Sequence, residues 1–418
     1  MSHESLQPGR AVVYHLPTLF SDSLRSLQFS QFFDAYRGAP FAVRTADGWS
    51  WNSRGRGGPE CIAQFRSRAD LDAVLGDASE AALGRIFLDG RLEIQGNIFT
   101  LLAVAEYALL HSEGLSSGLV QTLFRISSDM TRRLQRVRST ATPQNWQCAP
   151  CPLDLPTEFF APWLGPAMVH CCGDFRNGSA DLDAAQTEAL DRACGWLDLS
   201  AGDELLDVGC AWGSLSVHAA RQHYADAFGI TASQPQAEWA AERIGRNELR
   251  SRCHVECRDL RHSPYPAASF HKVATLGIFE QVPSSNFGKY LACVKKMLAP
   301  GGLLLMHRMT PTLTSGAHLR TLHPGLLSEP LSKDLALAEA GGWELVNIET
   351  MQRDYEETLR IWIGRLRQSS AELSHPFAFG YRAWLLYLVE IATSLHAEEL
   401  QVHRVLLRRP GRARALVC

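Results

Sequence analysis

Residues 204–222 read ELLDVGCAWGSLSVHAARQ, and this stretch decides the fold of the larger part of the chain. The apolar run over 204–209 predicts a buried strand, and 214–222 predicts a helix. Between them lies Gly209-Cys-Ala-Trp-Gly213, a turn of small residues that lets a ligand approach the backbone. The helix N-terminus at this turn favours a negative group such as a carboxylate. A cofactor, a dinucleotide or a tight packing contact would each suit the turn, whose spacing is not that of G-x-G-x-x-G.

Apolar runs and helical stretches alternate from about residue 181 onward. This alternation predicts an α/β fold with a doubly wound, mostly parallel sheet of seven strands. Ligands of such sheets lie at the carboxyl ends of the strands, where the strand order reverses. About fifty apolar-rich residues separate the last two strands, and we expect this helical insertion, at about 350–400, to cover the site. The expected strands are 204–209, 225–231, 253–257, 271–277, 303–307, 343–349 and 402–407, and the expected helices are 214–222, 236–246 and 289–298.

The first 128 residues follow a different pattern, which predicts a smaller α+β domain. Leu83–Phe99 resembles a hairpin with Asp89-Gly90 at its turn, and the apolar run Phe99–Leu110 has the length of a helix. Residues 129–160 are first basic and then rich in proline and polar residues, which predicts a linker. The expected organisation is a domain over 1–128, this linker, and a second domain over 161–418.

The composition excludes several classes of protein. The chain has 418 residues, 20% of them charged, and a formal net charge of −3, so it is neither disordered nor a globally basic nucleic-acid binder. No apolar run is long enough for a membrane-spanning helix, and the first residues do not resemble a secretory signal. Eleven cysteines without an export signal indicate reduced thiols in the cytoplasm.

Two clusters of arginines break the nearly neutral charge pattern. A peripheral lipid or phosphate surface would use such patches, and ordinary solvated charge is the simpler and favoured explanation. The clusters are Arg132, Arg133, Arg136 and Arg138, and Arg404, Arg408, Arg409, Arg412 and Arg414.

Four cysteines are candidates for a zinc site. Cys148 and Cys151 form a C-x-x-C pair, whereas Cys171 and Cys172 are adjacent. Zinc ribbons pair two C-x-x-C knuckles, and adjacent cysteines suit one ion poorly. The sequence therefore predicts no metal site.

Five motifs in the same order resemble the cyclopropane-fatty-acyl-phospholipid synthase family, which includes the mycolic acid methyltransferases. The resemblance covers most of residues 80–408. It implies an S-adenosylmethionine-dependent methyltransferase sheet preceded by a lipid-binding domain. The motifs are Gly209-Cys-Ala-Trp-Gly213 for G-C-G-W-G, Gly229-Ile-Thr-Ala-Ser-Gln-Pro-Gln236 for G-V-T-x-S-x-x-Q, Gly277-Ile-Phe-Glu280-Gln281-Val for G-M-F-E-H-V, Leu304-Leu-Met-His307 for L-L-H, and Tyr355-Glu-Glu-Thr-Leu-Arg-Ile-Trp362 for Y-x-x-T-L-x-x-W.

The resemblance also implies the roles of individual residues. In this family an alkene attacks the methyl group of a sulfonium and leaves a carbocation on the acyl chain. Bound bicarbonate is thought to take the proton whose loss closes the ring, in a pocket that excludes water. The side chains of Glu280, His307 and Tyr355 and backbone groups near Cys172 and Met309 would hold the bicarbonate. The residues implied for S-adenosyl-L-methionine are Asp207, Gly209, Ala211, Gly213, Thr231, Gln236 and Asp259.

Simpler roles stay open for each residue taken alone. Glu280 could cap a helix at the end of a strand, and His307 could be an ordinary core histidine. Tyr355 and Trp362 are seven residues apart on an expected helix, which an ordinary core stripe explains. The candidates for simple turn and cap residues are Thr231 and Gln236.

The chain departs from the family pattern at several positions. Pro152 and Leu153 stand where the family's H-Y-D-x-G-N-D stretch has histidine and tyrosine, and Gln281 stands where histidine is usual. Ala211 replaces a glycine of the cofactor turn, and His170-Cys-Cys-Gly-Asp174 replaces a version with tyrosine and serine. These departures leave the implied base site intact and bear on the product.

We therefore expect a cytoplasmic enzyme, peripherally associated with the inner membrane, that acts on unsaturated acyl chains at a phospholipid surface. It would form a cyclopropane ring across the double bond. Two alternatives remain: an acyl-chain methyltransferase that gives a methyl or methylene branch, and a lipid-binding paralogue without catalysis. No nucleic-acid partner is expected, and a homodimer is compatible with the sequence.

Overall fold

The computed structural model describes residues 26, 29–53, 55, 57–76, 86–110, 155–179, 181–262, 264–276, 282, 284–312, 329–373 and 375–411. The chain divides into two compact units, Met1–Ile126 and Ser127–Cys418. Each unit is described by itself.

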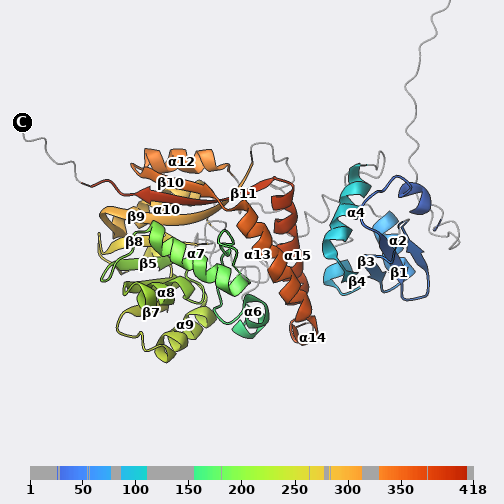
Figure 1. The fold of residues 1–418 in the computed structure, drawn as a ribbon, viewed down its shortest axis with the longest axis horizontal. Helices are drawn as coiled ribbons and strands as arrows, with labels where there is room; N and C mark the ends of the chain where they lie inside the picture. The colour runs from blue at the N-terminus through green and yellow to red at the C-terminus, as the bar shows by residue number, and fades with distance from the viewer. Residues whose placement is uncertain are drawn as a thin grey trace, which may run out of the picture. The chain divides into compact units, whose positions relative to one another are not determined.

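The N-terminal unit contains a four-stranded sheet in the order β2-β1-β3-β4 (Figure 1). Strands β1 and β3 are parallel, and the two outer pairs are antiparallel. A cluster of aromatic rings packs around Phe41 of β1, where Phe33 and Trp51 lie 5.0 and 5.5 Å away between ring centroids. The elements are β1 Phe41–Thr45, β2 Ser50–Asn52, β3 Cys61–Phe65, α2 Arg68–Gly76, β4 Leu92–Gly96 and α4 Ile98–Leu110.

The predicted hairpin over Leu83–Phe99 is wrong in its described part. Residues 86–88 are helical, and β4 pairs with β3 instead of with a preceding strand. Gly90 does form a turn, with a φ of 71°. A glycine in the sequence can predict where the chain turns. It does not predict which strand the next strand pairs with, because that depends on distant residues. The helix expected from the apolar run that follows is present as α4.

The larger unit is built on a seven-stranded sheet in the order β10-β11-β9-β8-β5-β6-β7 (Figure 1). Neighbours from β9 to β7 are parallel, and β11 is antiparallel to both β9 and β10. The prediction of a doubly wound, mostly parallel sheet is confirmed. The strands are β5 Glu204–Val208, β6 Asp226–Thr231, β7 Cys253–Cys257, β8 Phe270–Thr275, β9 Leu298–Pro311, β10 Glu344–Thr350 and β11 Leu400–Arg408.

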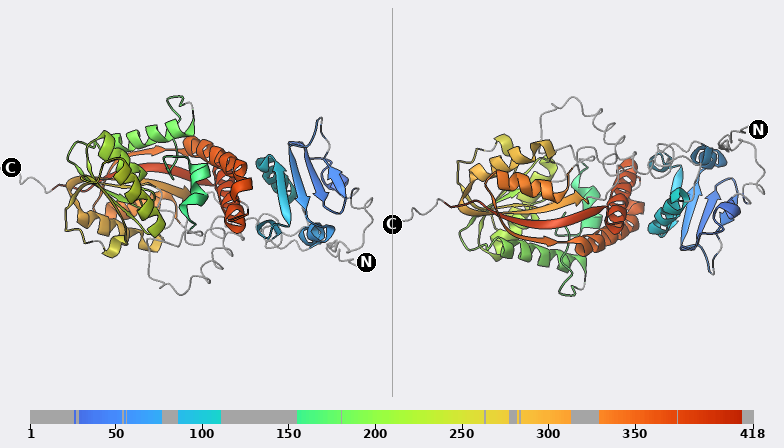
Figure 2. Two further views of the ribbon diagram at one scale, coloured as in Figure 1. Left: turned by 90° about the horizontal axis from the view of Figure 1, so that it is seen from below. Right: turned by 90° about the horizontal axis from the view of Figure 1, so that it is seen from above.

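Helices cover both faces of this sheet (Figure 2). One core packs α7 and α8 against Leu305 of β9 and Leu406 of β11. The other packs α10 and α12 against Leu304 and Met306 of β9. Because side chains alternate along a strand, His307 and Met309 share the α7 face with Leu305. These helices are α7 Leu182–Trp196, α8 Ser214–Gln222, α9 Gln234–Arg246, α10 Ser284–Met297 and α12 Leu331–Ala340, with a 3₁₀ turn at Leu260–His262.

The insertion between the last two strands forms helices, as expected. They are α13 Gln352–Gln368, α14 Ser370–Leu373 and α15 Ala378–His396, and α13 also packs against α6, Thr157–Leu164. Helix α6 therefore begins inside the range expected as linker. None of the described helices is long and apolar enough to span a membrane.

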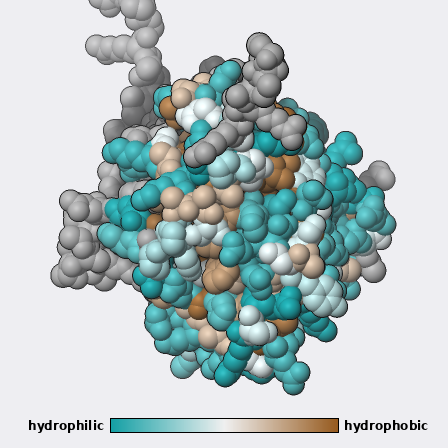
Figure 3. Space-filling model, turned by 90° about the vertical axis from the view of Figure 1, so that its left-hand side faces the viewer, coloured by the Kyte–Doolittle hydropathy of each residue, from teal (hydrophilic) through white to brown (hydrophobic). Residues whose placement is uncertain are grey.

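The face of the molecule seen in Figure 3 is mainly hydrophilic, with apolar groups scattered over it. Large apolar side chains are nonetheless exposed on the edge strand β10, where Leu345 and Ile348 are 51% and 37% exposed.

Candidate active site

The turn after β5 has the backbone that a ligand-binding loop requires. Gly209, Ala211 and Gly213 all have positive φ, at 73°, 48° and 71°. The amides of Gly209 and Cys210 donate to the carbonyl of Ile230 in β6, which fixes the turn to the neighbouring strand. Gly213 is the N-cap of α8 and has no side chain that could cap the helix, and a helix N-terminus of this kind favours a negatively charged ligand.

Packing beneath the turn explains why its residues are small. A Cβ atom on Gly213 would lie 3.2 Å from Val255 Cγ2 and 3.3 Å from Ala240 Cβ. Gly209 and Ala211 remain partly exposed, whereas Cys210 and Gly213 are buried. The turn therefore packs against Val255 and Ala240 on one side and exposes its backbone on the other. A ligand could lie against the exposed side.

Asp207 lies below the turn, where it stabilises the structure. Its carboxylate is buried and accepts a 2.8 Å hydrogen bond from Ser216 of α8. Burial raises the pKa of Asp207 to about 6, although the bond from Ser216 acts in the opposite direction. Asp207 therefore ties β5 to the first turn of α8.

Two further cofactor candidates, Thr231 and Gln236, meet at the end of β6. The Thr231 hydroxyl donates to Gln236 Oε1 at 2.7 Å and accepts from the amide of Ser233. Gln236 is half-buried, and its amide nitrogen has no hydrogen-bond partner among the described residues. The pair can present this amide group next to the turn after β5.

Asp259, which follows β7, is engaged with its own loop. Arg261 holds its carboxylate with bonds of 3.0 and 3.1 Å, and the Arg261 amide donates to it as well. Burial raises the pKa of Asp259, but the Arg261 bonds outweigh it and leave the pKa below its usual value. The Asp259 carboxylate is thus bonded within its own loop.

The segment His170–Asp174 is held between α7 and α13. The amide of Gly173 donates to Thr358 Oγ1 of α13 at 3.0 Å, and Gln186 of α7 donates to the carbonyl of Cys171. Cys172 is fully buried, and burial raises the pKa of its thiol well above the usual range. This thiol is therefore neutral, and Cys172 can offer a ligand its backbone.

His307 lies on β9 directly opposite Arg404 of β11. Arg404 Nε donates to His307 Nε2 at 3.2 Å. Because Nε2 accepts this bond, the neutral ring carries its proton on Nδ1. Burial, together with the charge of Arg404, lowers the pKa of His307 well below its usual value. His307 is thus a neutral donor in the interior.

Met309 lies two residues after His307 on β9, and Tyr355 is connected to β11 through the start of α13. Met309 pairs with Val402 of β11, and the carbonyl of Val402 accepts from the amide of Met351 at the start of α13. Tyr355 follows one helical turn later and is half-buried. The structure therefore brings His307, Met309 and the first turns of α13 to one end of the sheet.

Arg404 is the residue that sequence reasoning misplaced. It was assigned to a surface cluster, but its side chain is 0% exposed. Its Nη1 atom donates to Glu349 at 2.7 Å, while its buried Nη2 atom has no hydrogen-bond partner in the described part of the chain. A single arginine inside the apolar strand Val402–Leu407 was the signal, because a buried strand carries a charge only where it is paired.

A chain of charges connects Arg404 to the segment His170–Asp174. Glu349 accepts from both Arg404 and Arg176, and Arg176 also donates to Asp174 at 2.6 Å. Asp174 is contacted by Arg192 of α7 as well. Burial raises the pKa of Asp174, but the bonds from Arg176 dominate and lower the pKa to about 2. The guanidinium of Arg404 is therefore held in place from outside the site.

Sequence reasoning also missed an aromatic enclosure around His170. Four indoles lie around its imidazole, and Trp362 stacks on it at 5.5 Å between ring centroids. The imidazole is exposed, yet burial among protein lowers the pKa of His170 to about 4. His170 is therefore accessible and at the same time bordered by indole rings. The indoles are Trp163, Trp212, Trp362 and Trp384, at 5.5 to 6.4 Å from His170 between centroids.

Three of these indoles carry unsatisfied donors. The Nε1 atoms of Trp163, Trp362 and Trp384 are buried and lack a hydrogen-bond partner among the described residues, whereas Trp212 donates to Thr157. Buried donors without partners are rare in native proteins. The enclosure thus suits a ligand that brings acceptors or waters with it.

Several predicted positions lie outside the described residues. They are Glu280 and Gln281 with Gly277, the altered stretch from Cys148 through Leu153, and the arginines at 132–138, 412 and 414.

Comparison with known proteins places the chain in a class. The family model described as mycolic acid cyclopropane synthetase matches residues 140–405. A "Probable fatty acid methyltransferase" of Pseudomonas putida is 28% identical over 378 residues, which cover 87% of this chain and 91% of that protein. The cyclopropane-fatty-acyl-phospholipid synthase of Escherichia coli is 26% identical over 262 residues, 61% of this chain and 66% of the relative.

Among solved structures, the mycolic acid cyclopropane synthase CmaA1, in complex with SAH and CTAB, shares the fold. Its TM-score is 0.55 at 22% identity, with 61% of this chain and 95% of that chain covered. The fold and the turn after β5 define an S-adenosylmethionine-dependent methyltransferase. The chain belongs to the mycolic acid cyclopropane synthetase family.

Proposed function

We propose that this enzyme transfers a methylene group from S-adenosylmethionine across the double bond of an unsaturated acyl chain of a phospholipid. The product is a cyclopropane ring, and bound bicarbonate is the base. The observation that carries the proposal is the buried Arg404–His307 pair, with its unpartnered guanidinium nitrogen.

The residues around Arg404 fit a small anion. Arg404 Nη2 offers a charged donor, and neutral His307 offers its Nδ1 proton. Cys172 contributes no competing negative charge, because its thiol is protonated. Bicarbonate would supply the proton acceptor that these residues lack, since neither a buried neutral histidine of low pKa nor a protonated thiol is an effective base at neutral pH.

The reaction balances without an added oxidant or reductant. The alkene takes the methyl group from the sulfonium, which leaves as S-adenosylhomocysteine, and the positive charge moves to the acyl chain. Loss of one proton from the new methyl group lets its electron pair close the ring. The tryptophans around His170 would exclude water, which would trap the cation as an alcohol, and their π faces stabilise positive charge.

The turn after β5 would hold the methionine end of S-adenosylmethionine, and Thr231 with Gln236 would contribute from β6. The N-terminal unit would contact a phospholipid surface, with the enzyme in the cytoplasm and peripherally associated with the inner membrane. The homologous fatty acid methyltransferase supports a second candidate, a methyl or methylene branch in place of the ring.

Expression in a host without such an enzyme tests the proposal. A mass gain of one methylene in the unsaturated acyl chains is expected, and NMR spectroscopy of the purified lipid should detect ring protons. A methyl-branched product would establish the second candidate, and unchanged lipids with S-adenosylmethionine bound would indicate a paralogue without turnover.

Removal of bicarbonate tests the base separately. Activity should fall when dissolved bicarbonate is stripped and recover when it is restored. Glu280→Gln should lose turnover by about 100-fold while keeping cofactor affinity, because positioning of the anion matters mainly in the transition state. Full activity of this variant without bicarbonate would refute the base site.

A further inference from the structure

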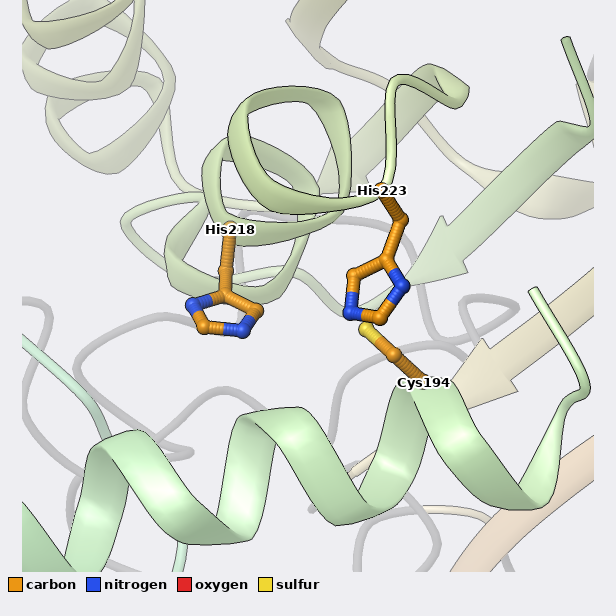
Figure 4. A group of neighbouring side chains, drawn as sticks. All are labelled: Cys194, His218 and His223. Carbon is orange, nitrogen blue, oxygen red and sulfur yellow. The ribbon is translucent and has the colours of Figure 1, made fainter. Parts of the chain in front are cut away.

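Two helices of the larger unit bring together a set of metal-binding side chains that the described methyltransferase site does not use. Cys194 and Asp191 lie on α7, three residues apart. His218 lies on α8, and His223 is the C-cap residue of that helix. In Figure 4 both imidazoles extend from α8 toward α7, and the Cys194 thiol points toward them.

The distances suit a shared ion. One donor atom from each of Cys194, His218 and His223 lies within 4.8 Å of the other two. Asp191 Oδ1 lies 2.7 Å from His218 Nε2 and 4.0 Å from His223 Nε2. Tetrahedral zinc with these ligand types needs edges of about 3.3 to 3.6 Å. Small side-chain rotations would close the set around an ion.

A second observation points to a ligand at this place. The His223 Nε2 atom is buried and has no hydrogen-bond partner among the described residues. A buried imidazole nitrogen without a partner is costly unless something binds it. His218 is already oriented by Asp191, whose side chain is 56% exposed.

The proposed site is buried on the side of Cys194 and open to solvent on the side of Asp191. Cys194 belongs to the apolar core beneath α7 and α8, and burial raises the pKa of its thiol to about 12. The exposed Asp191 side leaves a path from solvent. A divalent ion would have to displace the thiol proton, so binding should release protons and strengthen with pH.

We propose that Cys194, His218 and His223 form a structural Zn²⁺ site, with Asp191 as the fourth ligand. A thiolate, two imidazoles and a carboxylate are ligands that zinc accepts in tetrahedral geometry. The sequence predicted no metal site because the four residues come from two helices and lack a C-x-x-C spacing. The ion joins the C-terminal ends of α7 and α8, whereas the cofactor turn lies at the N-terminal end of α8.

Metal titration of the full chain tests the site. The protein is stripped with a chelator and titrated with Co²⁺ as a spectroscopic probe, and then with Zn²⁺ in competition. One ion per chain is expected, with visible bands of tetrahedral intensity and a thiolate-to-cobalt charge-transfer band. Zn²⁺ should displace the Co²⁺ and raise the unfolding temperature.

Variants assign the ligands. Cys194→Ala should abolish the charge-transfer band, and His223→Gln should weaken Zn²⁺ affinity by about 100-fold or more. His223 is at a helix end and partly exposed, so its variant should fold even where the change at buried Cys194 does not. Circular dichroism and S-adenosylhomocysteine binding verify folding.

Cys257→Ser and His254→Gln are matched controls, because both residues are exposed, lie on β7 and are not among the clustered donors. They should leave Co²⁺ spectra and Zn²⁺ affinity unchanged. Absence of stoichiometric binding to the stripped wild-type chain would overturn the proposal. So would a His223→Gln protein that is folded and binds Zn²⁺ as tightly as the wild type.

Discussion

Arg404 Nε lies 3.2 Å from His307 Nε2, and the two residues are direct cross-strand partners on β11 and β9. The pairing gives the buried histidine a fixed tautomer and brings a positive charge to it. It also leaves one guanidinium nitrogen for a ligand.

Arg404→Lys should raise the bicarbonate concentration needed for half-maximal rate and lower turnover by about 100-fold. Lysine keeps the charge but cannot bond Glu349, His307 and an anion together. The measurement is rate against bicarbonate at saturating S-adenosylmethionine. Arg308→Lys is the matched control, since Arg308 is equally buried but bonds Asp334 on the other face of β9. The Arg308→Lys protein should have a lower free energy of unfolding and an unaltered dependence of the rate on bicarbonate. An equal shift in both variants would contradict a direct role for Arg404.

Gly213→Val should abolish S-adenosylmethionine binding. A branched side chain there would have a left-handed φ of 71° and would press on Val255 and Ala240. Isothermal titration calorimetry measures the loss. Gly202→Val is the control, because Gly202 has a φ of 81° with nothing within 4 Å of its Cβ position. The Gly202→Val protein should be less stable than the wild type and should still bind S-adenosylmethionine. Unchanged affinity in Gly213→Val would remove the cofactor from this turn.

Ala211→Gly should stabilise the protein by about 0.5–1 kcal/mol, because glycine relieves the left-handed φ at the cost of some unfolded-state entropy. The unfolding temperature should rise by about 2 °C. Ala268→Gly, in a turn with a φ of 59°, should give a similar gain. Only Ala211→Gly should also change the affinity for S-adenosylmethionine. A gain at residue 268 alone would indicate that the turn after β5 tolerates alanine without strain.

The pH dependence of stability should contain a contribution from Asp207. Its pKa is about 6 in the folded chain and is raised from 3.8, so the folded state binds the extra proton. The contribution of Asp207 to stability is therefore greatest below about pH 4 and falls as pH rises through 6, by about 3 kcal/mol in total. The Asp207→Asn variant should lack this decline. Between pH 4 and 7 its free energy of unfolding should therefore rise relative to that of the wild type, and urea unfolding at each pH measures the difference. Glu242→Gln, at an exposed ion pair, should show no such trend.

Replacement of the arginines at 132–138 by glutamine should weaken binding to anionic vesicles, by about 1 kcal/mol for each charge near the surface. The loss should be larger at low salt, where screening is weaker. Vesicle co-sedimentation at two salt concentrations measures it. The control replaces the exposed Arg246, which pairs with Glu242 on α9, and should bind as the wild type does. Binding that ignores both salt and substitution would rule out an electrostatic patch.

Local patterns predicted most of the larger unit. Helix α8 and strand β7 have the expected bounds, because a clear change of hydrophobic period marks each. Strand β9 is longer than expected. It extends through the Pro-Gly-Gly stretch with a shift in register against β8, a detail that depends on its neighbours.

The cofactor turn and the pairing of Thr231 with Gln236 also follow from nearby residues. The position of Arg404 does not, because it depends on which face of β11 meets β9. The enclosure around His170 draws indoles from α6, α13 and α15, and no local spacing connects these helices.

The antiparallel strand β11 also determines the order in which the site is made during synthesis. The cofactor turn is closed by Ile230, only about twenty residues further on, so it can form as soon as β6 has left the ribosome. His307 must wait for Arg404, which is 97 residues later in the chain. Contacts between such distant residues form slowly. A nascent chain should therefore complete its cofactor turn before it completes the Arg404–His307 pair, and a chain cut short before β11 would have the first without the second.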